Sequence, residues 1–225
     1  MSATSFAPSV NSSLKRICVF CGSKHGARPG YTDSARSLAQ TLVKHKIGLV
    51  YGGGTVGLMG EIARGVQSGL GAHAVLGVIP EALAPREISS ELIGDTKIVN
   101  DMHERKAMMA RNADGFIAMP GGLGTLEELL EVMTWQQLGF HAKPIGLLNT
   151  EGFYDPLLAF FKHCIDEGFL NVSHQNVVVS ADPEQLVQQM MEWQPPASNV
   201  LADAKQRQAA IGEDIAQGAQ HDAGS

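Results

Sequence analysis

Short runs of apolar and β-branched residues alternate along the chain with longer stretches in which apolar residues recur every three or four positions. Most of the short runs are apolar at successive positions, which is typical of strands that are covered on both faces of a sheet. Seven runs are predicted to be strands, at residues 16–22, 47–52, 74–79, 97–99, 115–119, 144–148 and 176–179.

The stretches between these runs predict helices with one apolar face. Apolar residues recur at the spacing i, i+3, i+4 and i+7 within residues 35–43 and again within residues 126–133, and a further helix is predicted at 153–167. Helices that connect consecutive parallel strands cover the faces of the sheet. The pattern therefore predicts a Rossmann-like, doubly wound α/β fold, with a mainly parallel sheet of about seven strands and helices on both faces.

One domain accounts for most of the 225 residues, since a domain usually has roughly 100–200. The alternating pattern occupies residues 15–193, which we expect to be the Rossmann-like domain that carries the function. Residues 194–225 contain few large apolar side chains and are expected to form a disordered tail, because such a segment cannot offset its ordering entropy. Residues 1–14 are expected to be a flexible N-terminal segment.

Composition excludes several classes of protein. The formal net charge is −6 and no run of Lys and Arg stands out, so we expect no nucleic-acid partner. No window approaches the 18 or more apolar residues of a membrane span, and no targeting segment is visible, so we expect a cytoplasmic protein without a membrane partner. Cys18 and Cys21 have the spacing of redox and zinc half-sites, but they lie within an apolar run and fit buried thiols better.

A glycine-rich stretch at residues 52–60 follows a predicted strand and leads into a helix. It matches the G-x-G-x-x-G pattern, in which glycines allow a phosphate to approach the backbone and the free amides of a helix start. A dinucleotide site would also need an acidic residue about 20 positions later, and only Glu81 lies nearby. An NAD-linked enzyme therefore remains one alternative.

A second glycine-rich stretch, at residues 120–128, also lies between a strand and a helix. Thr125 can offer a hydroxyl group at the helix start, and Glu127 and Glu128 follow directly. The helix dipole alone would favour carboxylates there, by roughly 0.3–1 kcal/mol each. However, the carboxyl ends of parallel strands meet at one edge of the sheet, so both glycine loops are expected there. Together they predict a site for one phosphorylated small molecule beside a carboxylate.

A third segment, residues 103–106, begins the helix before the strand that leads into the second glycine loop. It starts like a zinc-protease helix, but the second histidine of that pattern would fall at Ala107, so no metal site is expected. Arg105 lies at the start of this helix, and Glu128 follows the next strand. Both side chains are therefore expected to reach the same edge of the sheet.

These motifs together resemble the LONELY GUY family, the cytokinin riboside 5′-monophosphate phosphoribohydrolases. They are Pro120-Gly121-Gly122-x-Gly124-Thr125-x-Glu127-Glu128, Met102-His103-x-Arg105-Lys106, Gly52-Gly53-Gly54-x-x-Gly57-Leu58-Met59-Gly60 and Cys21-Gly22-Ser23. The similarity runs from about residue 16 to residue 193. It implies a homodimer that cleaves an N6-substituted adenosine 5′-monophosphate to the free base and ribose 5-phosphate, without a metal or other cofactor.

The resemblance also implies which residues act. Arg105 and Glu128 would be the catalytic pair, with Arg105 holding either the phosphate or the departing base. Contacts to the nucleotide would come from Ser23, Gly53, Gly54, Met59, Glu87, Lys106, Gly121, Gly122, Gly124, Thr125, Glu127 and Thr134. Members of this family are often labelled lysine decarboxylases, but no lysine here lies in a context typical of a pyridoxal phosphate anchor.

The chemistry also follows from the residues. Breaking a ribosyl bond builds positive charge on the sugar, so a nearby carboxylate is more useful in the transition state than in the ground state. Glu128 fits that task. The alternative from another class is a Rossmann-like carrier that binds a nucleotide or cofactor without turnover.

Overall fold

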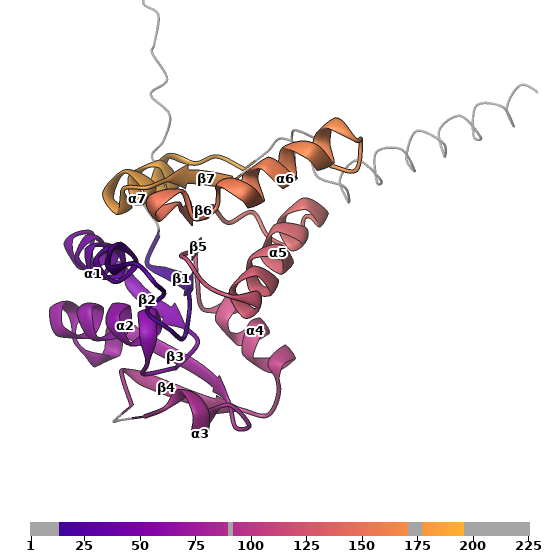
Figure 1. Ribbon diagram of the computed structural model, residues 1–225. Coiled ribbons are helices and arrows are strands. Elements are labelled where there is room, and N and C mark those ends of the chain that lie inside the picture. The colour runs from indigo at the N-terminus through magenta and orange to yellow at the C-terminus, as the bar shows by residue number, and fades with distance from the viewer. Residues whose placement is uncertain (1–13, 90–91, 171–176, 196–225) are drawn as a thin grey trace, which may run out of the picture.

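The computed structural model describes residues 14–89, 92–170 and 177–195 as a seven-stranded, fully parallel sheet between two layers of helices (Figure 1). The predicted α/β fold is thereby confirmed. The predictions for the first thirteen residues and for residues 196–225 lie outside the described residues. The strands are β1 Arg16–Phe20, β2 Gly48–Tyr51, β3 Val75–Pro80, β4 Asp95–Val99, β5 Gly115–Ala118, β6 Ile145–Leu148 and β7 Val177–Ser180.

Two apolar cores lie on opposite faces of the sheet, because neighbouring residues of a strand point to opposite sides. In β1, Ile17 and Val19 belong to one core, whereas Cys18 and Phe20 belong to the other. The first face is covered by α1 Pro29–Lys44, α2 Gly57–Leu70 and α7 Pro183–Glu192. The second is covered by α4 Met102–Arg111, α5 Leu123–Leu138 and α6 Asp155–Asp166.

Short helices complete the fold: α3 Ala84–Glu87 and the 3₁₀ turns η1 Ala72–Ala74 and η2 Thr150–Gly152. In the described part of the chain, no helix combines the length and the apolar character that crossing a membrane requires. Cys18 and Cys21 are buried, free thiols.

The strand order β4-β3-β2-β1-β5-β6-β7 places a switch point between β1 and β5. The chain first builds the sheet outward from β1 to β4, and then returns to the other side of β1. The connections that leave β1 and β5 therefore lead to opposite faces, which opens a crevice at the carboxyl edge. The amide of Gly22 after β1 donates to the carbonyl of Pro120 after β5, at 3.1 Å, so the two loops are joined at the base of this crevice.

Candidate active site

A cavity of about 270 Å³ lies at this switch point, and we call it the catalytic cavity. Its walls come from the end of β1, from the loops after β1, β2 and β5, from α3, and from the starts of α2, α4 and α5. The predicted site residues that line it are Ser23, Met59, Glu87, Arg105, Gly122, Gly124, Thr125 and Glu128. Seven further lining residues were not among the predicted site residues, namely Val19, Phe20, Cys21, Gly22, Gly52, Met102 and Leu123. The quoted motifs name four of them, Cys21, Gly22, Gly52 and Met102, and this was the signal that the sequence offered.

The start of α5 has the features of an anion cradle. Gly122 is the residue that precedes the first turn, and the amides of the first residues of a helix have no partner within it. A Cβ atom built on Gly122 or Gly124 would meet nothing within 4 Å. The packing of the described residues therefore gives no reason for glycine at these two positions. Close approach of a ligand to the backbone does give one.

The first glycine loop differs from the start of α5, because several of its backbone groups already form hydrogen bonds within the protein. Leu58 N donates to Gly22 O at 3.1 Å, and Thr55 N donates to Glu87 O at 2.9 Å. Gly57 has a φ of +58°, and a Cβ atom there would collide with the backbone of Ser23. The glycine is thus required by the close approach of the loop after β1.

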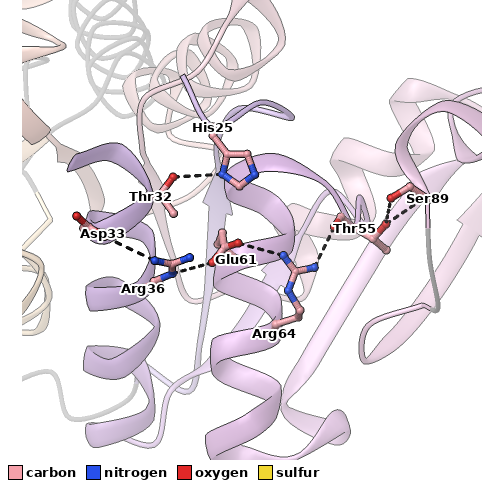
Figure 2. Close-up of polar contacts among 8 residues, drawn as sticks. All are labelled: His25, Thr32, Asp33, Arg36, Thr55, Glu61, Arg64 and Ser89. Atoms are coloured by element: carbon pink, nitrogen blue, oxygen red, sulfur yellow. Dashed lines mark hydrogen bonds and ion pairs between the residues drawn. The ribbon is translucent and has the colours of Figure 1, made fainter. Parts of the chain in front are cut away.

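Polar contacts between α1 and α2 hold the first glycine loop from its other side (Figure 2). Arg64 on α2 donates to the carbonyl of Thr55 at 3.0 Å and to Glu61 at 3.3 Å, and Glu61 also accepts from Arg36 of α1 at 2.9 Å. The Thr55 hydroxyl accepts from the amide of Ser89 at 3.0 Å. Burial opposes ionisation of Glu61, but the two arginines outweigh it and lower its pKa. The loop is thus held by contacts on both sides, and its residues Gly52 and Met59 line the cavity.

Arg105 enters the cavity from the first turn of α4. This turn is fixed by Asp101, whose carboxylate accepts from the amide of Glu104 at 2.8 Å, and by Glu104, which accepts from the amide of Asn100 at 2.9 Å. The guanidinium is buried, with Nη2 at 3.4 Å from Gly52 O and 3.8 Å from Glu128 Oε1. A Cβ atom on Gly52 would collide with this Nη2, so glycine there gives the guanidinium its place.

Glu128, one turn into α5, is buried beside Arg105. Burial raises its pKa to about 7 because a charged carboxylate loses its hydration. Arg105 opposes this rise, while the nearby carboxylates of Glu127 and Glu87 add to it. A carboxyl group that titrates near neutral pH can accept and release a proton during a reaction.

Two buried polar atoms at the cavity have no hydrogen-bond partner among the described residues. They are the acceptor Oε2 of Glu87 and the donor Nε of Arg105. Buried polar groups are normally paired, so such atoms call for an explanation. A ligand that offers one donor and one acceptor would satisfy both.

The remaining predicted site residues do not line the catalytic cavity. Lys106 is paired with Glu127 and, at 3.0 Å, with Glu131, and the hydroxyl of Thr134 donates to Leu130 O at 2.7 Å. The other three predicted positions belong to the glycine loops. A Cβ atom on Gly53 would meet Ile79, one on Gly54 would meet the methyl group of Met59, and one on Gly121 would meet the hydroxyl of Thr125.

Within the described residues, no three His, Cys, Asp or Glu side chains gather as they would around a metal ion. No lysine is among the residues that line the catalytic cavity.

Comparison with known proteins agrees with the motifs. A family model described as "Possible lysine decarboxylase" matches residues 59–190. The cytokinin riboside 5′-monophosphate phosphoribohydrolase LOG7 of Arabidopsis thaliana is 56% identical over 192 residues, which cover 85% of this chain and 88% of that protein. The probable cytokinin riboside 5′-monophosphate phosphoribohydrolase LOGL2 of Oryza sativa subsp. japonica is 52% identical over 197 residues, covering 87% and 80%.

Solved structures share the fold at lower identity. The molybdenum cofactor carrier protein of Chlamydomonas reinhardtii is 22% identical, with a TM-score of 0.58 over 80% of this chain and 99% of that one. This likeness concerns the fold alone. These relatives, which are more than 50% identical to this chain over the aligned residues, confirm the resemblance inferred from the motifs, and the chain belongs to the LONELY GUY family of cytokinin riboside 5′-monophosphate phosphoribohydrolases.

Proposed function

We propose that this protein hydrolyses the N-glycosidic bond of N6-substituted adenosine 5′-monophosphates and releases the free base and ribose 5-phosphate. The names of its relatives point to this substrate class. The observation that carries the proposal is the pairing of Glu128, with a pKa of about 7, and Arg105 in a cavity that also holds the start of α5.

The start of α5 is the proposed phosphate site. The amides of Leu123, Gly124 and Thr125 are the first three of the helix, and the helix dipole favours an anion at this end. A phosphate held here leaves the ribose within the same cavity as Glu128, one helical turn away. The charged end of the substrate is thereby fixed before the sugar reacts.

Glu128 is the proposed base and charge stabiliser. As the C1′–N9 bond breaks, its electron pair leaves with the base and positive charge develops on the ribose. Ionised Glu128 stabilises that charge and takes a proton from the attacking water, whose oxygen bonds to C1′. The departing base takes up one proton from solvent, and Glu128 then releases to solvent the proton that it took from water, so that the products are neutral base and ribose 5-phosphate. General-base help of this kind contributes about 10²–10⁴ in rate.

Arg105 and Glu87 are proposed to orient the nucleotide. The guanidinium of Arg105 keeps part of Glu128 ionised and offers its unpaired Nε to a ligand acceptor. The unpaired carboxylate oxygen of Glu87 can accept the N6–H that a singly substituted adenine retains. These two contacts would satisfy both buried atoms that lack partners.

We further propose that the active form is a homodimer. Three exposed apolar side chains lie at the rim of the catalytic cavity or on the same helix: Leu123 is 86% exposed, Leu130 42% and Met102 39%. A second copy that covered them would also cover the exposed residues Glu127 and Thr134, which with Lys106, the partner of Glu127, would complete the nucleotide site.

Incubation with AMP and with N6-isopentenyladenosine 5′-monophosphate tests the activity. We expect stoichiometric release of free base and ribose 5-phosphate, measured by chromatography with mass detection, and faster turnover of the substituted nucleotide. Saturable binding of both nucleotides with no released base would overturn the proposal and leave a carrier.

A further inference from the structure

A second cavity, of about 320 Å³, lies between the C-terminal halves of α4 and α5, and we call it the aromatic cavity. Its volume reaches the range of small-molecule sites, which begins near roughly 300 Å³. It shares no lining residue with the catalytic cavity, and none of the motifs from the sequence accounts for it.

Aromatic rings form much of its wall. Phe116 lies at its base in β5, Trp135 comes from α5, and Phe140 and His141 follow that helix. The rings of Phe116 and His141 are 5.2 Å apart. Phe140 is 66% exposed, so packing in the apolar core does not account for this ring. Planar faces on several sides favour a flat, aromatic occupant.

The charged groups at this cavity are both cations. Arg111 ends α4 and is exposed, and the ammonium group of Lys143 lies 5.8 Å from the centre of the Phe116 ring. None of the residues that line it in the described part of the chain is Asp or Glu, although the chain as a whole has a net charge of −6. The local charge therefore favours an anion.

His141 adds a neutral ring. The backbone amide of Lys143 donates to its Nδ1 at 3.2 Å, so its Nε2 carries the proton and donates to Val132 O at 2.9 Å. Burial also lowers the pKa of this histidine. Lys143 donates to Ala110 O at 2.7 Å. Burial lowers the pKa of Lys143, and the nearby carboxylate of Asp114, which accepts from two backbone amides, opposes this shift.

We propose that the aromatic cavity binds a small aromatic monoanion, with its ring against Trp135 and Phe140 and its charged group facing Arg111 and Lys143. Ala107 and Ala110 line the same cavity with small side chains, which leave room for the ring.

Calorimetric titration with 1-naphthoate tests the site. We expect one binding event per chain with a Kd below about 1 mM, at least tenfold weaker binding of the uncharged 1-naphthylmethanol, and no displacement of naphthoate by inorganic phosphate. Lys143→Met and Arg111→Gln should each weaken naphthoate binding at least tenfold. The matched control is Lys162→Met on α6, an exposed lysine away from the cavity, which should bind as the unmodified protein does.

Four results would overturn the proposal, and the first three come from the titrations themselves. They are a lack of saturable binding, equal affinity for the charged and uncharged naphthalenes, and unchanged affinity in both cation variants with a melting temperature like that of the unmodified protein. A fourth is loss of naphthoate binding when AMP is added in excess, because it would place the probe in the catalytic cavity.

Discussion

The charge of Glu128 depends on two opposing effects, the loss of water around a buried carboxylate and the nearby guanidinium of Arg105. The first effect prevails and raises the pKa to about 7, from 4.5 for an ordinary glutamate. An ionised, paired carboxylate of low pKa would be a weak base at neutral pH. Burial thus makes this residue suited to proton transfer.

The pH dependence of kcat/KM should report this pKa. If ionised Glu128 is the active form, kcat/KM rises about tenfold per pH unit below pH 7 and levels off above it.

Gly52→Ala places a methyl group where Nη2 of Arg105 lies and displaces the guanidinium. Because Arg105 lowers the pKa of Glu128, we expect the midpoint of the variant to move to higher pH and its kcat to fall. An unchanged midpoint would show that Arg105 does not control this carboxylate.

Glu128→Gln should separate catalysis from binding. The amide keeps the size of the side chain but can neither accept the proton of water nor stabilise a cationic sugar, so turnover should fall at least 10²-fold. The Kd for AMP, measured by calorimetry, should stay within a few-fold. Glu167→Gln, at an exposed glutamate that follows α6 and lies outside the catalytic cavity, is the control and should keep its turnover. An active Glu128→Gln variant would reduce this glutamate to a helix-start residue.

At the scale of elements, the cap of α4 sets the position of Arg105. Asp101→Ala removes the hydrogen bond to the amide of Glu104 and should cost about 0.5–2 kcal/mol of stability. Because Arg105 lies in the turn that follows, we also expect a clear loss of turnover. Asp182→Ala provides a matched control, since Asp182 caps α7 through the amide of Gln185 in the same way. Urea unfolding should show similar losses for both variants, and equal turnover in both would refute the positioning role of the cap.

The two glycine loops show what the sequence could and could not reveal. Their place at strand ends was predicted correctly, because strand and helix periodicity fix it. Their different roles were not visible, because a glycine required by a neighbouring backbone, such as Gly57, looks the same in sequence as one that faces open space, such as Gly124. The short helix α3, which carries Glu87, has too few residues for any periodicity.

At the scale of the whole molecule, the strand order brings Arg105 and Glu128 together. The sequence predicted that both reach one edge of the sheet, and the 3.8 Å between Nη2 and Oε1 agrees with that expectation. It could not predict that Lys106 pairs with Glu127 and Glu131 away from the cavity, because these contacts depend on the rotation of α4 and α5 about their axes.

A second copy of the chain would give the exposed residues of α5 a role. Leu130 lies on the exposed side of α5, beside Thr134, which bonds its carbonyl. Leu130→Glu should therefore convert a dimer to a monomer, because a carboxylate cannot be buried in an apolar interface without a partner. Light scattering after size-exclusion chromatography measures the mass, and activity at the same concentration should fall with it. Phe160→Glu, at an apolar side chain on α6 that is 58% exposed, is the control and should leave the mass unchanged. If the Leu130→Glu variant keeps both its mass and its turnover, the interface does not include Leu130, or the protein does not need a dimer for activity.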